Sequence, residues 1–172
     1  MIRLSAAAMM FALMFVLSAC ESADETVAPK KVAAPVVLVA PANADDDAWK
    51  TYLQLVVSQN MGSVTDRVYP YYLPANSTVP TPGDRENKSQ YDRQLENVSG
   101  VVSRSVLPGN MLVFGSPDSS KMADLAVAAF TGAKVDALRG SQVLFIGKAG
   151  DSDRVKAAVE AAGAKYIFIE TR

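Results

Sequence analysis

Two stretches near the C-terminus share one pattern: residues 111–134 read MLVFGSPDSSKMADLAVAAFTGAK, and residues 143–165 read VLFIGKAGDSDRVKAAVEAAGAK. Each has an apolar run ending in glycine, a polar turn, an alanine-rich segment with helical spacing of apolar residues, and Gly-Ala-Lys. Continuously apolar runs, without alternation of polar residues, are typical of strands buried on both faces. The sequence therefore predicts a duplicated strand–helix unit, closed by a last strand over residues 166–170.

This duplication fits two architectures. If the helices before Ser105 cover the second face of the sheet, the protein belongs to the α/β class. It is then a small three-layer α/β/α sandwich on a short, mainly parallel sheet. If Val135–Leu138 is also a strand, the unit is βαβ twice and the fold is α+β, ferredoxin-like. Asp136 within this candidate strand and Gly140 shortly after it favour the sandwich.

The ferredoxin-like alternative is similar in its order of elements to the SPOR domains, which bind denuded peptidoglycan in bacterial envelopes. The similarity covers residues 111–172 and rests on element order alone. It implies that peptidoglycan is a partner of this domain.

Helices are expected before and within the repeat. Asp45–Asp47 precede apolar residues at helical spacing, and acidic residues suit a helix N-terminus because they accept hydrogen bonds from its free N–H groups. Three consecutive aspartates cannot all point at one ion, so a cap is favoured over a metal site. A second helix is expected over residues 89–105. Ser116 and Asp151 are predicted to cap the helices of the two repeat copies.

The N-terminus has the pattern of a secretory signal over residues 1–19. One charge, Arg3, precedes the apolar run Leu4–Leu17, and small residues follow. Leu17-Ser18-Ala19-Cys20 resembles the lipobox of bacterial lipoproteins, in which the peptidase cuts before the cysteine and the thiol carries lipid. An ordinary cleaved signal and an uncleaved anchor are the alternatives.

The lipobox resemblance implies an acylated Cys20, palmitate among its chains, and a domain held at a membrane without spanning it. The resemblance to Gram-negative lipoproteins also implies the outer over the inner membrane, because Glu21, a residue other than Asp, follows the cysteine. The domain then faces the periplasm. Residues 20–44 are rich in Ala and Pro and are predicted to be a tether, or a tether whose residues 36–40 add an edge strand. Residues 45–172 are predicted to be one globular domain.

Composition excludes several kinds of chemistry. The chain has no histidine and one cysteine, so a Ser-His-Asp triad, a His-ligated metal and an intramolecular disulfide are all excluded. With 17 Lys+Arg against 18 Asp+Glu, the net charge of −1 offers no basic face for nucleic acid. We expect no cofactor, no metal and no enzymatic activity.

Candidate ligand residues follow the two apolar runs. Ser116, Asp118, Lys148 and Asp151 lie in loops beyond the carboxyl ends of the predicted strands, where open α/β sheets bind ligands. Both loops lead into helix N-termini, which can hold an anion. Neither loop has a GxGxxG or P-loop motif, so helix capping is the competing interpretation.

Tyr69, Tyr71 and Tyr72 are close together in YPYYLP, a segment that its prolines hold extended. They form either a strip over the core or an aromatic surface for a partner. We expect a non-enzymatic, lipid-anchored envelope protein whose domain binds a protein partner or peptidoglycan. The alternative is a small-ligand binder for an anion or a sugar.

Overall fold

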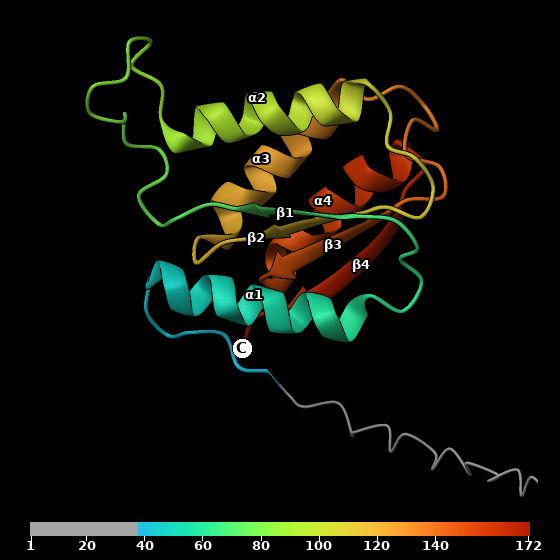
Figure 1. The fold of residues 1–172 in the computed structure, drawn as a ribbon, viewed down its shortest axis with the longest axis horizontal. Coiled ribbons are helices and arrows are strands. Elements are labelled where there is room, and N and C mark those ends of the chain that lie inside the picture. The colour runs from blue at the N-terminus through green and yellow to red at the C-terminus, as the bar shows by residue number, and fades with distance from the viewer. Residues whose placement is uncertain (1–37) are drawn as a thin grey trace, which may run out of the picture. The chain divides into compact units, whose positions relative to one another are not determined.

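A parallel four-stranded sheet lies between two layers of helices in the computed structural model, which describes residues 38–172 (Figure 1). In chain order the elements are α1 (Asp46–Asn60), β1 (Val68–Tyr72), α2 (Gln90–Ser103), β2 (Met111–Gly115), α3 (Ser119–Thr131), β3 (Gln142–Gly147), α4 (Ala149–Ala161) and β4 (Lys165–Glu170). The sheet order is β1-β2-β3-β4, and each neighbouring pair is parallel. The α/β class and the three layers are confirmed.

The sequential strand order decides where the helices lie. Parallel crossovers are right-handed, so connections that all step in one direction put their helices on one face. The helices α2, α3 and α4 share that face, and of the four helices in residues 38–172 only α1 covers the other (Figure 1). The expectation that both helices before Ser105 cover the second face is wrong for α2, because α2 is itself a crossover.

The duplicated unit is present as β2–α3 and β3–α4, and β4 closes the sheet. The ferredoxin-like alternative is wrong, because all strand pairs are parallel and Val135–Leu138 forms a turn. Within this turn Asp136 has a φ of 60°, and Leu138 is fully buried in the core of the α2–α4 side. The element order that makes the chain similar to SPOR domains is therefore not found.

The predicted cap of α1 is confirmed, and the predicted caps of α3 and α4 are shifted. The Asp45 side chain accepts a hydrogen bond from the Ala48 N–H (2.7 Å), as expected for the cap of α1. The N-cap of α3 is Asp118 and not Ser116, and that of α4 is Lys148. Asp151 lies in the first turn of α4. Ser116 lies two residues before the cap of α3, and its hydroxyl accepts from the N–H of Asp118 itself while donating to the Leu73 carbonyl.

Residues 38–45, just before α1, belong to the same compact unit as the sheet. Leu38 and Ala40 pack against the core of the α1 side, although the sequence assigns residues 38–44 to a tether. Residues 38–40 are not a strand. The predicted signal segment, the lipidated Cys20 and the rest of the tether lie outside the described residues.

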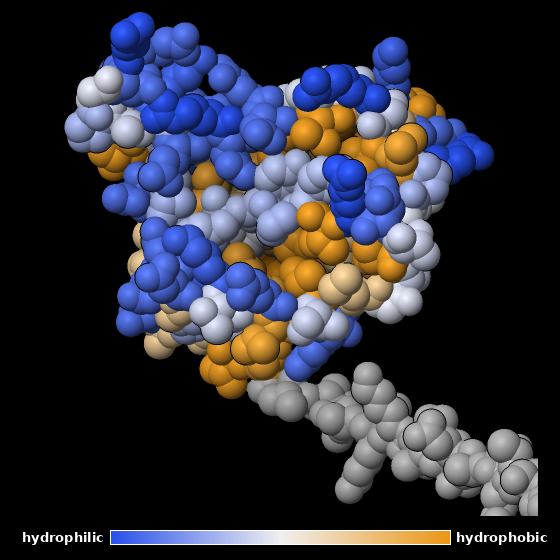
Figure 2. Space-filling view, viewed as in Figure 1, coloured by the Kyte–Doolittle hydropathy of each residue, from blue (hydrophilic) through white to orange (hydrophobic). Residues whose placement is uncertain are grey.

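The surface view separates two regions on the side shown. The loop over residues 75–89 is mostly hydrophilic, as its sequence predicts, and apolar side chains reach the surface between α1 and the opposite helix layer (Figure 2). Within the described part of the chain, no helix has both the length and the hydropathy of a membrane-spanning segment.

Candidate functional site

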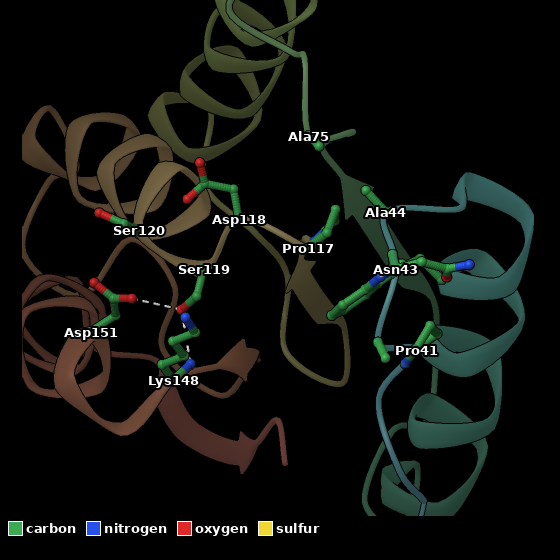
Figure 3. A pocket seen from close by; sticks show the side chains of 12 residues that line it. Pro41, Asn43, Ala44, Ala75, Pro117, Asp118, Ser119, Ser120, Lys148 and Asp151 are labelled. Carbon is green, nitrogen blue, oxygen red and sulfur yellow. Dashed lines mark hydrogen bonds between the residues drawn. The ribbon is translucent and has the colours of Figure 1, made fainter.

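A pocket of about 410 Å³ opens at the carboxyl edge of the sheet, beyond the ends of β2 and β3 (Figure 3). The β2–α3 and β3–α4 loops form one wall, and the segment before α1 forms the other. The pocket is lined by Pro41, Ala42, Asn43, Ala44, Trp49, Ala75, Pro117, Asp118, Ser119, Ser120, Lys148 and Asp151. Three of the four predicted ligand residues therefore meet in one place.

The segment before α1 supplies a wall that the strand order of this sheet does not provide. In many open sheets the order reverses, and a crevice forms between helices on opposite faces. The order here never reverses, so the second wall comes from residues 41–44. The indole N–H of Trp49, a buried residue of α1, donates to the Asn43 carbonyl (2.8 Å) and holds this wall in place.

Ser119, which the sequence analysis does not single out, joins the two loops. Its hydroxyl donates to the Asp151 carboxylate (2.7 Å) and accepts a hydrogen bond from the Lys148 backbone N–H (2.8 Å) (Figure 3). The Ser119 residue is 4% exposed, so both bonds are shielded from water. Ser119 is the first residue of α3, and the start of each helix in a strand–helix repeat lies next to the loop of the following copy. This position in the repeat is the signal in the sequence that could have identified Ser119.

The Asp151 carboxylate is also held by Arg154, which donates to it at 2.8 Å and to Asp124 at 2.5 Å. Burial alone would raise the pKa of Asp151. The hydrogen bonds from Ser119 and Arg154 outweigh that effect and lower the pKa below its usual value. Asp151 is therefore ionised, and its bonds to Ser119 and Arg154 hold the two loops of the pocket wall together.

The close approach of the two loops requires glycine at the end of β3. A Cβ atom on Gly147 would lie 2.6 Å from the Ser119 hydroxyl oxygen and 2.8 Å from the Phe145 ring. The corresponding residue of the first copy, Gly115, makes room for Leu53 of α1, whose methyl carbon would lie 2.4 Å from an added Cβ. Glycine therefore occupies the same position in both copies of the repeat, but it makes room for a different side chain in each.

The N-terminus of α4 is the part of the pocket without a side-chain cap, and the positive charge of Lys148 there helps to lower the pKa of Asp151 in the first turn. No side chain caps α4, and the Lys148 ammonium makes no ion pair with any residue in the range 38–172. Gly150 faces open space. By contrast, the Asp118 carboxylate accepts from the Lys121 N–H (3.1 Å) and caps α3. The pocket therefore pairs a capped helix start with an uncapped one.

Ser116 has a structural role. It is 1% exposed, and its hydroxyl donates to the Leu73 carbonyl (2.8 Å) and accepts from the Asp118 N–H (3.0 Å). These bonds join the ends of β1 and β2. Ser116 borders a neighbouring cavity of about 340 Å³ and not the pocket itself.

The three tyrosines do not form one exposed surface. Tyr71 is buried and its ring stacks on Phe114 (5.2 Å), while Tyr69 packs against the same core. Tyr72 lies on the opposite face and donates its hydroxyl hydrogen to Asp46 (2.8 Å), and burial together with this bond raises the pKa of the phenol. The core-covering interpretation describes this segment, and Tyr71 is closed to a partner.

Within residues 38–172, no cluster of three or more Cys, Asp or Glu side chains is arranged to hold a metal ion. The chain matches no protein-family model, no curated protein and no solved structure.

Proposed function

We propose that the protein is a non-enzymatic, lipid-anchored envelope protein whose domain binds an anionic group in the pocket at the carboxyl edge of the sheet. The observation that carries the proposal is the uncapped N-terminus of α4, which opens on this pocket beside the unpaired ammonium of Lys148. Free N–H groups and the positive end of the helix dipole attract a negative charge.

The pocket also indicates which other groups an anionic ligand would carry. Asp151 also lines the pocket, but its carboxylate is already held by Ser119 and Arg154. The Asp118 carboxylate lies on the β2–α3 loop of the same wall and repels a ligand that is negative on both sides. It would accept a hydrogen bond from a hydroxyl or an ammonium group instead. A carboxylate on a sugar or on a peptide that also carries an amine or hydroxyl fits this arrangement.

Two sources supply such a ligand in a cell envelope. Peptidoglycan carries carboxylates on its sugars and stem peptides, which agrees with the partner expected for a lipoprotein whose lipid on Cys20 holds it at the outer membrane. A free sugar acid or other small anion is the second source. A site open to solvent, with Lys148 exposed, accommodates either one.

The single tryptophan makes ligand binding directly measurable. Trp49 lines the pocket, so its fluorescence should change when N-acetylmuramic acid or inorganic phosphate is titrated into the full chain, and should not change with neutral N-acetylglucosamine. Lys148→Gln should weaken the binding about tenfold, since a hydrogen bond to a charged group contributes roughly 1.5–3 kcal/mol. Lys156→Gln, on the exposed side of the same helix, should leave it unchanged.

Equal loss in both lysine variants, or equal responses to neutral and acidic sugars, would contradict the proposal. Isolated sacculi distinguish the two sources of the ligand. If sacculi retain the wild-type chain but not Lys148→Gln, the ligand is peptidoglycan. If only free anions change the fluorescence, the domain is a small-ligand binder.

The anchor needs a separate test. In a Gram-negative host, labelled palmitate should be incorporated into the wild-type chain and not into Cys20→Ser, and only the wild type should sediment with outer membranes. Label that persists in Cys20→Ser would refute lipidation at this residue while leaving the ligand proposal standing.

A further inference from the structure

A second cavity, of about 420 Å³, lies at the amino edge of the sheet, the edge opposite to the pocket described above. This amino-edge cavity opens where β1 begins and α2 ends (Figure 1). Its walls come from the residues around the start of β1, from the end of α2 and from the loop that leads to β2. Open parallel sheets usually bind ligands at the other edge, so the side chains here have to be considered on their own.

Two guanidinium groups from different elements line the amino-edge cavity. Arg67 directly precedes β1, and Arg104 is the C-cap of α2. The Arg104 Nε donates to the Gly100 carbonyl (2.8 Å), and its side chain forms no ion pair within residues 38–172. The Arg67 Nε lies 3.9 Å from the Asp66 carboxylate, which is beyond the length of a hydrogen bond. Both guanidinium groups therefore keep N–H groups for a ligand.

The charge balance of the amino-edge cavity favours a carboxylate. Among the residues that line it, Asp66 is the single acid, so two positive charges face one negative charge. This excess suits an anion with one charge. The planar guanidinium group stays ionised at all physiological pH values, and its parallel N–H groups match the two oxygens of a carboxylate.

Apolar side chains form the rest of the wall. Val106 is buried in the core of the α2–α4 side, and the half-buried Tyr69 packs against the same core. Leu107 also lines the cavity, with 70% of its surface exposed. An apolar group placed between Tyr69 and Leu107 would remove apolar surface of both from water, which is favourable. The ligand that fits the cavity therefore carries an apolar group beside its carboxylate.

A buried amide holds the charged and the apolar parts of the cavity together. Asn110 is 3% exposed, accepts a hydrogen bond from the Arg67 backbone N–H (3.2 Å) and donates to the Leu107 carbonyl (2.9 Å). The backbone on both sides is thus fixed before a ligand binds, which lowers the cost of ordering it. Leu38, the first described residue, packs on the α1 side of the sheet and does not line this cavity.

We propose that the amino-edge cavity binds a small carboxylic acid that carries an apolar or aromatic group. Arg67 and Arg104 hold the carboxylate, and the apolar group lies against Tyr69 and Leu107. This second site is separate from the pocket at the carboxyl edge, and it does not depend on the anion that we propose to bind there.

Isothermal titration calorimetry on the full chain tests the class of ligand with three matched probes. Hydrocinnamate carries a carboxylate and a phenyl group, hydrocinnamyl alcohol has the same carbon skeleton without the charge, and acetate lacks the phenyl group. Hydrocinnamate should bind at least about tenfold more tightly than either, because the alcohol loses the charged hydrogen bonds and acetate loses the apolar contact.

Substitutions locate the binding site. Arg67→Gln and Arg104→Gln should each weaken hydrocinnamate binding about tenfold, because each removes a charged donor. Both side chains are exposed, so the core stays intact, and circular dichroism should confirm that the variants are folded. Arg85→Gln, which removes an exposed arginine outside the cavity, is the matched control and should leave the affinity unchanged.

Absence of hydrocinnamate binding, equal affinities for the acid and the alcohol, or an equal loss in Arg85→Gln would overturn the proposal. So would a loss of binding in Lys148→Gln but not in Arg104→Gln, which would place the acid in the carboxyl-edge pocket and agree with the proposed function instead. Binding that Arg104→Gln weakens and Lys148→Gln leaves intact would support the second site, whatever the first pocket binds.

Discussion

The Ser119 hydroxyl donates a 2.7 Å hydrogen bond to the Asp151 carboxylate across a separation of 32 residues and thereby ties the first copy of the repeat to the second. Ser119→Ala removes this donor and also leaves the Lys148 N–H without its acceptor. We expect the variant to lose about 1–3 kcal/mol in the free energy of unfolding, measured by urea denaturation. Ser120→Ala, an exposed neighbour, should change it by less than about 0.5 kcal/mol.

Gly147→Ala should also destabilise the protein, by about 1–3 kcal/mol, because the new methyl group would press on Ser119 and Phe145. Gly150→Ala, three residues later, is the matched control. It meets nothing within 4 Å and lies in a helix, so it should raise the free energy of unfolding by about 0.4–1 kcal/mol. Equal effects of the two substitutions would show that the contact with Ser119 is unimportant.

The pH dependence of stability should report on Asp151. Its pKa is lowered in the folded protein from the usual 3.8, so its ionised form stabilises the fold above pH 3.8. This contribution is lost as the pH falls through the lower folded pKa. Urea denaturation between pH 5 and pH 2, a window of roughly one unit above and two below the usual carboxyl pKa, should show a flatter decline for Asp151→Asn than for the wild type. The decline of Asp153→Asn, an exposed aspartate of the same helix, should match the wild type.

The start of α1 offers a test of the cap. Asp45→Ala removes the acceptor of the Ala48 N–H and should cost about 1 kcal/mol, with a lower melting temperature. Asp47→Ala removes an exposed ion pair with Lys50 and should cost close to nothing. If calcium raised the melting temperature of the wild type but not of Asp45→Ala, a metal site would be indicated in place of a cap.

The layered fold could be predicted because its signal is local. The apolar runs at Met111 and Val143 and the helices after them repeat one pattern, and Asp45 and Ser89 are ordinary caps. The strand β1 was harder to predict, because Pro70 and three tyrosines resemble a loop. Pro70 is tolerated because β1 is an edge strand, a property of the assembled sheet and not of the segment.

The pocket could be predicted only in part. Asp118, Lys148 and Asp151 were expected at the carboxyl ends of strands, and the structure brings them together. Ser119 was missed because its bonds to Asp151 and Lys148 cross between two copies of the repeat. The wall at residues 41–44 was missed for a related reason, since the bond from the Trp49 indole to the Asn43 carbonyl has no signal in the sequence.

The uninterrupted strand order has a consequence for how such a chain could arise and lengthen. Each strand–helix unit attaches to the strand before it and covers only its own part of one face, so a further unit could follow Glu170 without moving any existing element. The glycine of each copy shows how little has to change at such a junction, because the same residue accommodates Leu53 in one copy and Ser119 in the next. A gene coding for this domain could therefore grow by tandem duplication at its 3′ end, one strand at a time.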